Sequence, residues 1–170
     1  MERIAAFEKV SREQFRKDWT DTFPDSSVEE ADRIYDELRL PERATRGSAG
    51  YDFYTPLAIT LQPGEMIKIP TGIRARMKEG WVLLCFPRSG LGFRFRMQLN
   101  NTVGVIDSDY CDSDNEGHIF VRITNDSKDG KVMSIPYQGG FVQGIFMPFG
   151  ITEDDCAKEA RNGGFGSTGV

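Results

Sequence analysis

Residues 57–86 read LAITLQPGEMIKIPTGIRARMKEGWVLLCF, and short apolar runs in this stretch are separated by turn sequences. Gln62-Pro63-Gly64-Glu65 and Lys78-Glu79-Gly80 are the turns, because proline presets the first turn residue and glycine adopts positive φ without strain. Short runs bounded by proline and glycine are typical of strands. The stretch therefore predicts four strands in succession, at Leu57–Thr60, Met66–Ile69, Ile73–Met77 and Trp81–Phe86.

The same pattern continues toward the C-terminus, where strands are expected at His118–Thr124, Lys131–Ile135 and Phe141–Met147. Many short strands at regular spacing predict an all-β sandwich, jelly roll or barrel. The chain has 170 residues without internal repeats or an interdomain linker. Residues 1–170 are therefore expected to form one domain with its own core.

The N-terminal part differs from the rest, because all 18 glycines fall between Gly47 and Gly169 and residues 1–46 contain none. A short strand is expected at Arg3–Lys9. After it, helical signals predict an insertion over about residues 11–38 that decorates the β domain.

The first helix of this insertion is predicted from its start signals. Ser11 followed by Gln14 is a capping-box pattern, and Val10 with Phe15 is placed as a hydrophobic staple. The helix is expected to continue through about Trp19.

The second helix is expected to begin at Ser26 or Ser27, with Glu29 or Glu30 in its first turn. Pro41 is expected to end it. Its apolar face keeps helical spacing and consists of Val28, Ala31, Tyr35 and Leu38.

Composition narrows the class of protein. Hydrophobic residues make up 39% and charged residues 28%, which is ordinary for a globular protein. A net charge of −5 argues against a surface that coats nucleic acid, although a local basic pocket remains open. The chain has no long apolar run, so no membrane partner is expected.

Cysteine and histidine usage limits the chemistry further. Cys85, Cys111 and Cys156 are widely spaced and odd in number, which predicts free thiols in a reducing cytoplasm. His118 is the single histidine, so a site with several histidine ligands is excluded. We expect His118 to be half-exposed on a strand.

Five segments carry residue types that suit phosphate and base recognition. In order along the chain they are Ser48-Ala49-Gly50-Tyr51-Asp52, Pro87-Arg88-Ser89-Gly90-Leu91, Gly104-Val105-Ile106-Asp107-Ser108-Asp109-Tyr110, Phe141-Val142-Gln143-Gly144 and Arg161 through Gly169. A Walker-type nucleotide site is excluded, because no Gly-x-x-x-x-Gly-Lys-Ser/Thr sequence is present.

Each segment taken singly also has an ordinary interpretation. Arg88 and Ser89 suit phosphate oxygens, but an exposed turn has the same composition. Gln143 is a lone polar residue in an apolar strand, which fits either a ligand contact or a hydrogen bond in the core. Asp107 and Asp109 alternate on an extended segment, so they are expected to point to opposite sides. An acidic pair of this kind is commonly solvated or bound to a cation.

The C-terminal segment is the most unusual of the five. Glycine-rich backbone is costly to order, and chain ends are usually disordered unless something holds them. Arg161, Ser167 and Thr168 suit phosphate, and Phe165 suits a flat ring. We expect residues 161–170 to close over a ligand as a flexible lid, with a plain linker as the alternative.

In order and spacing, the five segments resemble the five motifs of the trimeric all-β dUTPases (deoxyuridine triphosphate nucleotidohydrolases), from about Leu40 to the C-terminus. The resemblance implies a distorted jelly-roll or β-barrel fold of the β-clip type, and a homotrimer whose subunits share each active site. It implies hydrolysis of dUTP to dUMP and pyrophosphate by attack of water on the α-phosphorus. That reaction limits uracil incorporation into DNA and supplies dUMP for thymidylate synthesis.

The resemblance also implies a role for each matching residue. Asp107 would orient and deprotonate the attacking water, and Arg88 and Gln143 would be the other catalytic residues. Ser89 and Gly90 would hold the triphosphate together with them.

The nucleoside end of the substrate would meet another set of residues. Asn101, Gly104 and Ile106 would read the uracil edge, while Tyr110 would pack under the deoxyribose and leave no room for a 2′-hydroxyl. The tail would contribute Arg161, Phe165, Gly166, Ser167 and Thr168.

Mg²⁺ is the cofactor that the resemblance implies. It would be bound mainly by phosphate oxygens and water, with Asp52 in the outer shell. The implied partners are dUTP and further copies of the chain, without nucleic acid or membrane.

The chain departs from the family pattern at three places. The helical stretch 11–38 stands where many relatives have a short loop. We expect it simply to pack on the domain, with bracing of the trimer, covering of the site or binding of a partner as alternatives. Residues 111–117 are longer than the usual tight turn and strongly acidic, which favours a solvated turn over a metal loop. Gly140 stands where arginine is common, which puts in doubt an ion pair that some relatives use.

Two other functions remain open from the sequence. Deoxycytidine triphosphate deaminase shares the fold, but it needs a glutamate-based site, and the intact 106–110 segment and tail favour dUTP hydrolysis. A regulatory binding protein built on the same scaffold is motivated only by the acidic helical extension.

Overall fold

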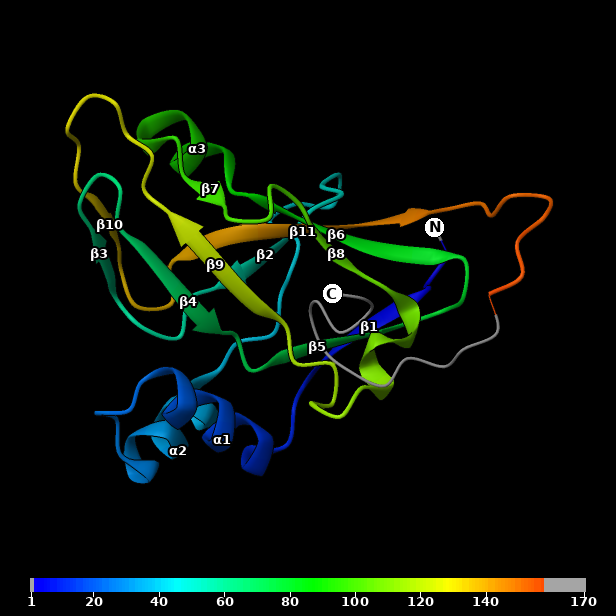
Figure 1. The fold of residues 1–170 in the computed structure, drawn as a ribbon, viewed down its shortest axis with the longest axis horizontal. Coiled ribbons are helices and arrows are strands. Elements are labelled where there is room, and N and C mark those ends of the chain that lie inside the picture. Colours follow the sequence, from blue (N-terminus) through cyan, green and yellow to red (C-terminus); the bar gives the residue numbers. More distant parts are fainter. Residues whose placement is uncertain (1, 158–170) are drawn as a thin grey trace.

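A computed structural model describes residues 2–157 of the chain (Figure 1). The described part is mostly β-sheet with three short α-helices and one 3₁₀ helix, so the predicted fold class is confirmed. None of the described helices is both long and apolar enough to cross a membrane.

The described strands pair in an antiparallel manner throughout. They are β1 (Ala5–Lys9), β2 (Tyr51–Tyr54), β3 (Ile59–Leu61), β4 (Met66–Pro70), β5 (Ile73–Met77), β6 (Trp81–Pro87), β7 (Gln98–Leu99), β8 (Gly104–Ile106), β9 (Phe120–Thr124), β10 (Met133–Ile135) and β11 (Gly140–Pro148). The helices are α1 (Arg12–Thr22), α2 (Val28–Glu37), α3 (Ser89–Phe95) and the 3₁₀ helix η1 (Ser108–Asp112). The sheets have the orders β1-β5, β10-β3, β2-β11-β6-β8 and β4-β9-β7.

The expected barrel does not close among the described strands, which form four separate small sheets. The consecutive strands β4, β5 and β6 each belong to a different sheet, so the chain changes sheets at the turns between them. Gly72 and Gly80 in these turns have φ of 74° and 78°, values that glycine adopts without strain. Changing sheets at successive turns gives a jelly-roll-like arrangement with open edges instead of one continuous curled sheet.

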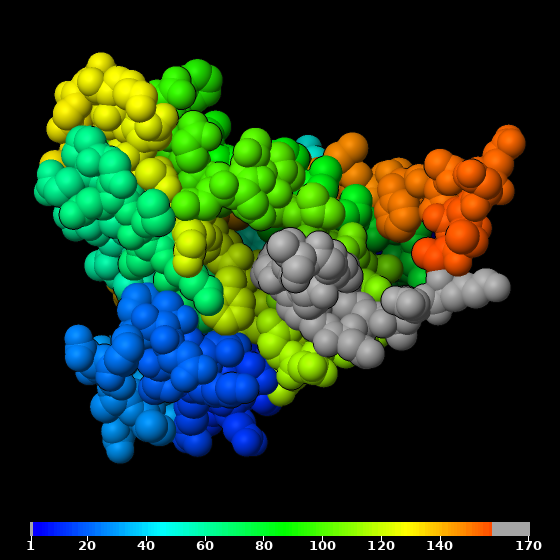
Figure 2. Space-filling view, viewed as in Figure 1, coloured from blue at the N-terminus to red at the C-terminus, as the bar shows by residue number. Residues whose placement is uncertain are grey.

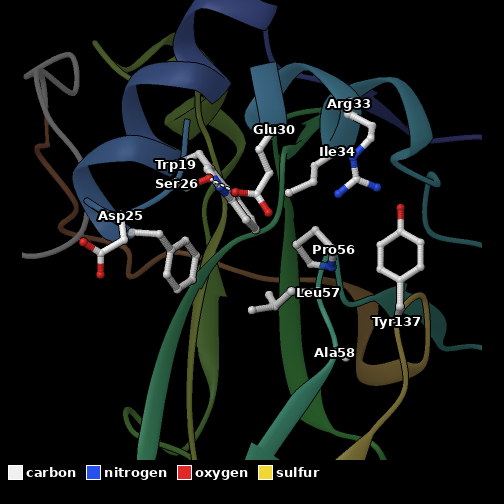
Figure 3. Close-up of a pocket in the computed structure, with 11 residues that line it drawn as sticks. Trp19, Asp25, Ser26, Glu30, Arg33, Ile34, Pro56, Leu57, Ala58 and Tyr137 are labelled. Carbon is white, nitrogen blue, oxygen red and sulfur yellow. Dashed lines mark hydrogen bonds between the residues drawn. The ribbon is translucent and has the colours of Figure 1, made fainter. Parts of the chain in front are cut away.

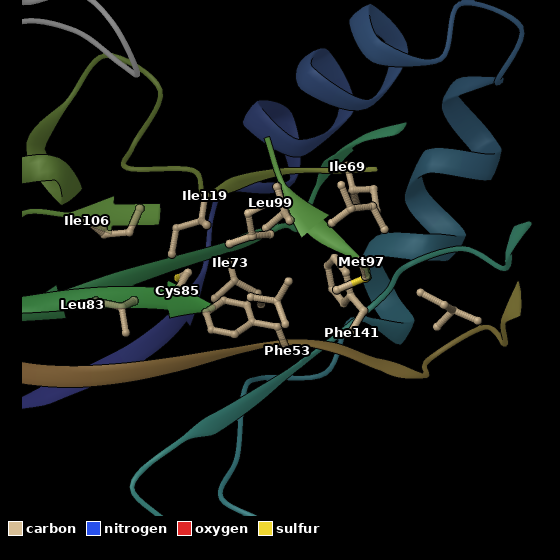
Figure 4. Close-up of a cluster of buried hydrophobic side chains, with 14 of the residues drawn as sticks. Phe53, Ile69, Ile73, Leu83, Cys85, Met97, Leu99, Ile106, Ile119 and Phe141 are labelled. Carbon is tan, nitrogen blue, oxygen red and sulfur yellow. The ribbon is translucent and has the colours of Figure 1, made fainter. Parts of the chain in front are cut away.

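The main core lies between these sheets (Figure 4). Its most buried members come from different strands, and Phe53, Ile69, Leu83, Ile123 and Phe141 are each at most 1% exposed. On β9 buried residues alternate with less buried ones, as expected for a strand with one face toward the core. The core thus holds several short strands together, none of which would be stable as an isolated hairpin.

Strand bounds agree with the sequence prediction to within about two residues, and β5 matches at both ends. β3 begins later than predicted because the backbone N–H and C=O of Leu57 bond to the Thr55 hydroxyl. β10 also begins later, because the backbone of Lys131 bonds to the side chains of Ser127 and Asn125. Side-chain bonds of this kind compete with the sheet for backbone groups.

α1 has Ser11 as its N-cap, as predicted, and the Ser11 hydroxyl accepts a hydrogen bond from the Gln14 N–H at 3.1 Å. The reciprocal half of the predicted capping box is wrong. Gln14 donates its side-chain amide to Asp18, and the Ser11 N–H donates instead to the carboxylate of Glu116. A distant acidic residue therefore replaces Gln14 at the start of the helix.

α2 has Ser27 as its N-cap, and the Ser27 hydroxyl accepts from the Glu30 N–H at 3.1 Å. The helix ends at Glu37, ahead of the predicted stop at Pro41. The predicted apolar face is wrong at Val28, which is 49% exposed. Val28 is the first residue of the helix, whereas the buried residues of α2 lie further along it.

The two helices build a second, smaller core of their own. It consists of Val10, Phe15, Trp19, Ala31 and Ile34. The predicted staple between Val10 and Phe15 is confirmed, because both side chains are fully buried in this cluster. Leu57 packs against both cores and joins them. Figure 2 shows the insertion, in blue, as a lobe against one side of the β region.

Candidate active site

One sheet, with the order β2-β11-β6-β8, carries four of the five segments singled out in the sequence. Asp52 lies on β2, Gln143 on β11 and Gly104 on β8, and Arg88 directly follows β6. Gln143 pairs with Asp52 across one edge of β11 and with Phe86 across the other. Strand register therefore brings residues from distant parts of the chain to neighbouring positions.

Arg88 and Asp52 form an ion pair, with Nη2 of Arg88 3.4 Å from Oδ2 of Asp52. The backbone N–H of Arg88 also donates to the carbonyl of Phe141 at 3.1 Å, which fixes the chain on β11. The Arg88 side chain is 46% exposed, so its pairing contributes little to stability. The ion pair instead orients the partly exposed guanidinium of Arg88 beside Gln143.

Two glycines leave the space that these side chains occupy. A Cβ on Gly140 would lie 2.5 Å from Nη1 of Arg88, and one on Gly50 would lie 2.7 Å from Oε1 of Gln143. Both distances are far too short for real contacts, so each glycine is required for the close approach. Gly140, the departure noted in the sequence, is thus the position over which Arg88 passes.

The segment after Pro87 forms a helix and not an exposed turn, which is the ordinary interpretation of its composition. Residues Ser89–Phe95 form α3, whose first turn contains the exposed residues Ser89 and Gly90. Glycine disfavours a helix by about 1 kcal/mol. Packing of Leu91 and Phe95 against the main core offsets that cost. The first-turn N–H groups of a helix have no intrahelical acceptor, so this turn suits anionic oxygens.

The predicted base-reading residues line one small pocket beside β8. Asn101, Gly104 and Ile106 lie in its wall together with Cys85, against which Gly104 packs closely. Burial raises the pKa of Cys85 to about 12, so this thiol remains neutral. The described cysteines are free thiols, as predicted.

Asp107 follows β8 and is the N-cap residue of η1. The expectation that Asp107 and Asp109 alternate on one extended segment was wrong, because the chain turns into η1 at Ser108. The Tyr110 N–H donates to the Asp107 carbonyl at 3.2 Å within this turn. Asp107 is half-buried, whereas Asp109 is exposed.

Tyr110 is 2% exposed and lies at the edge of the main core. Its hydroxyl donates to the carbonyl of His118 at 2.9 Å. The prediction of a half-exposed His118 was wrong, because His118 is fully buried. Its ring is held by Asp18 and by the backbone N–H of Gly72, two contacts that its place in the sequence does not reveal.

The described site residues fall into two groups at opposite ends of β6. Ile106 pairs with Leu83, so Asp107 lies at the beginning of β6, while Arg88 follows its end. From Leu83 to Arg88 an extended strand covers about 17 Å, and Asp107 lies one residue further away, roughly 20 Å from Arg88. Within one subunit, Asp107 and Arg88 do not reach the same phosphorus atom.

The acidic segment 111–117 is a folded turn. Asp112 and Asp114 are exposed, as expected of a solvated turn, whereas Glu116 is bonded to Ser11. Among residues 2–157 no three His, Cys, Asp or Glu side chains converge as metal ligands would. The predicted lid residues Arg161, Phe165, Gly166, Ser167 and Thr168 lie outside the described residues.

A pocket larger than the one beside β8 lies elsewhere, between the helical insertion and the connection from β2 to β3 (Figure 3). Trp19, Ile34, Leu57 and Tyr137 are among its lining residues. None of the residues singled out for nucleotide chemistry lines it. The candidate site is thus defined by the register of the sheet and by residue chemistry, and it lies apart from this larger pocket.

Comparison with known proteins gives matches over most of the chain. The family model described as dUTPase matches residues 36–169. The chain is 42% identical over 136 residues to deoxyuridine 5′-triphosphate nucleotidohydrolase of Lactococcus lactis, covering 78% of this chain and 89% of that protein. A protein of the same name from Tolumonas auensis is 39% identical over 145 residues, with coverage of 81% and 91%.

A solved structure agrees with these matches. The crystal structure of dUTPase from Streptococcus mutans superposes with a TM-score of 0.63 at 32% identity, covering 87% of this chain and 98% of that one. The family match also extends over the C-terminal segment that the sequence singled out. The chain therefore belongs to the dUTPase family.

Proposed function

We propose that this protein hydrolyses dUTP to dUMP and pyrophosphate by attack of water on the α-phosphorus. The observation that carries the proposal is the grouping of Asp52, Arg88 and Gln143 on one sheet, with glycines that open space around two of them. In H₂¹⁸O, the label is expected in dUMP. Label found in pyrophosphate would place the attack elsewhere and overturn this mechanism.

The triphosphate is held at the end of β6. Arg88 offers a guanidinium fork, Gln143 an amide, and Ser89 and Gly90 the first turn of α3. Arginine pairs well with phosphate oxygens because two N–H groups can bond at once. Catalysis of phosphoryl transfer depends mainly on positioning and charge stabilisation, which this group of residues supplies.

Asp107 acts as the general base that orients and deprotonates the attacking water. A carboxylate suits this task because it needs only to be ionised and within hydrogen-bond reach of the water. Asn101, Gly104 and Ile106 read the uracil edge from their shared pocket. Tyr110 supports the deoxyribose and excludes a ribose 2′-hydroxyl.

The active unit is a homotrimer in which the subunits share each site. Sharing between subunits is supported by the roughly 20 Å that separate Asp107 from Arg88 along β6, a separation that one triphosphate does not bridge. The number of three subunits rests on the resemblance to the trimeric family. Asp107 of one subunit then acts on a phosphate held by Arg88 of another. Residues 161–170 close the site as a lid, with Arg161, Ser167 and Thr168 on phosphate and Phe165 on uracil.

Mg²⁺ fits the residues present. It commonly binds through one or two carboxylates together with substrate phosphates, and keeps several waters. Asp52 offers a carboxylate beside Arg88, where the phosphates lie, and would hold the ion from its outer shell through water. The Asp52 side chain is 15% exposed. When bound, the ion neutralises charge on the phosphate oxygens.

The cytoplasmic location inferred from the cysteines stays a prediction.

Gly50→Ala is expected to weaken binding of a non-hydrolysable α,β-imido analogue of dUTP by about tenfold, because a hydrogen bond to a charged group contributes about 1.5 kcal/mol or more. The added methyl would displace the Gln143 amide, the far end of a flexible side chain, so the fold is retained. Titration calorimetry measures the affinity. Gly47→Ala is the control, since nothing lies within 4 Å of that position. Equal affinities for the two variants would remove Gln143 from the site.

A further inference from the structure

The helical insertion is bonded to the segment that follows Asp107 at two points. At the first point, Ser11 binds Glu116 through its N–H at 2.7 Å and its hydroxyl at 2.6 Å. Burial raises the pKa of Glu116, but the bonds from Ser11 outweigh burial and hold this pKa below its usual value. The start of α1 is therefore tied to the acidic turn 111–117.

The second point is a buried contact between Asp18 on α1 and His118. Nδ1 of His118 lies 2.5 Å from Oδ2 of Asp18, and Nε2 accepts the backbone N–H of Gly72 at 2.7 Å. A backbone N–H can only donate, so the hydrogen-bond network assigns the imidazole proton to Nδ1 and makes Asp18 its acceptor. Gln14 donates to the same carboxylate oxygen at 2.8 Å. Burial raises the pKa of Asp18, but the bonds from His118 and Gln14 outweigh it and lower this pKa overall.

His118 is in turn bonded to Tyr110 through its backbone. The His118 carbonyl accepts the Tyr110 hydroxyl at 2.9 Å, and the Asn115 amide donates to that hydroxyl at 3.0 Å. The His118 ring also packs against Phe120, with ring centroids 4.7 Å apart. A displacement of His118 would therefore move the carbonyl that holds the Tyr110 ring.

Gly72 completes the junction between the insertion and the β region. Its φ is 74°, and a Cβ there would lie 2.2 Å from Cδ1 of Leu38 and 3.2 Å from the Phe15 ring. The turn between β4 and β5 is thus pressed against the insertion, with its N–H directed at His118. Three unusual features of the sequence, the helical stretch, the acidic turn and the single histidine, meet at this junction.

We propose that α1 is a positioning element for sugar discrimination, in which Asp18 and His118 set the place of the Tyr110 ring against the deoxyribose. The proposal rests on the proposed dUTP hydrolysis. His118 and Asp18 are positioning residues, because they act through Tyr110 and do not touch the substrate. The insertion then contributes to selecting deoxyribose over ribose, beyond simply covering the β region.

A merely structural role for Asp18 would lower stability without changing substrate choice. The informative quantity is therefore the ratio of kcat/KM for dUTP to kcat/KM for UTP. Asp18→Ala is expected to lower this ratio about tenfold, the low end of what the shape of a pocket contributes to specificity. Asp18→Asn retains an oxygen that accepts from Nδ1 of His118, so it should restore most of the ratio.

Asp32→Ala is the matched control. Asp32 lies on α2 and pairs with Arg12 and Arg16 on α1, so its loss loosens the insertion from within. The melting temperature is expected to fall in this variant, while the dUTP to UTP ratio stays at the wild-type value. An equal fall of the ratio in Asp32→Ala would mean that any loosening of the insertion has the same effect, and would overturn the specific role of Asp18.

If Asp18→Ala does not fold, the same ratio of kcat/KM values is measured with Tyr110→Phe. It removes the hydroxyl bonded to the His118 carbonyl and keeps the ring, and it should lower the ratio by a similar factor. Combined with Asp18→Ala, it should lower the ratio no further, because both changes break one connection. An unchanged ratio of kcat/KM values in either folded variant overturns the positioning role of Asp18 and His118, but it leaves the proposed dUTP hydrolysis intact. Failure of the wild-type protein to hydrolyse dUTP would instead overturn the proposed function.

Discussion

The Asp107→Asn variant is expected to hydrolyse dUTP about 10²–10⁴-fold more slowly than the wild-type protein, the range by which a general base contributes. An amide has the shape of the carboxylate but does not accept a proton from water. The contact that Asp107 makes within the turn of η1 uses its backbone carbonyl, so the substitution leaves that contact in place. Affinity for the non-hydrolysable analogue should change little.

Single-turnover measurement of dUMP formation, alongside calorimetric binding, separates the two effects. Asp114→Asn is a suitable control, because Asp114 is an exposed carboxylate on the same segment and lies outside the proposed site. It should turn over dUTP at nearly the wild-type rate. Turnover by Asp107→Asn at a comparable rate would refute the role of Asp107 as base.

Mixed trimers of Arg88→Ala and Asp107→Asn subunits are expected to regain activity, although each variant alone should have only a small residual activity. Arg88 and Asp107 lie at opposite ends of β6, so a shared site takes each from a different subunit. With random mixing of equal amounts, about a quarter of the sites combine an intact Arg88 with an intact Asp107. Activity should approach about a quarter of the wild-type value after the two variants are unfolded and refolded together.

Mixing Arg88→Ala with Gln143→Ala subunits provides the control for this experiment. Arg88 and Gln143 belong to the same end of the sheet, so no subunit of that mixture supplies both. This mixture should stay inactive. Activity in neither mixture would mean that one subunit contains the whole site, and the shared-site account would be abandoned.

The sequence motifs single out Asp52, Arg88 and Gln143, and the structure places these three residues close together on one sheet. Their grouping depends on the pairing of β2, β11 and β6, strands that are far apart along the chain. The local sequence pattern does not reveal which residues of these strands pair with one another. That pairing could be expected only through resemblance to a family in which all five motifs occur in the same order.

Long-range contacts explain the main errors. His118 looked like an ordinary strand residue, but Asp18, which lies on α1 near the other end of the chain, draws it into a buried contact. The sequence predicts that Gln14 completes a capping box, but the Ser11 N–H donates to the carboxylate of Glu116 instead. α3 was missed because its glycines disfavour a helix, whereas packing against the core decides the outcome.

The most direct test of the central claim is pyrophosphate release by the purified wild-type protein from dUTP, compared with dCTP, dTTP and UTP, each with and without Mg²⁺. We expect rapid release from dUTP in the presence of Mg²⁺ and at least about a hundredfold lower kcat/KM for the other three nucleotides. Hydrogen bonds to the base edge reject dCTP, whereas lack of space rejects the methyl group of dTTP and the 2′-hydroxyl of UTP. Ammonia release from dCTP, or equal rates with all four nucleotides, would contradict the assignment.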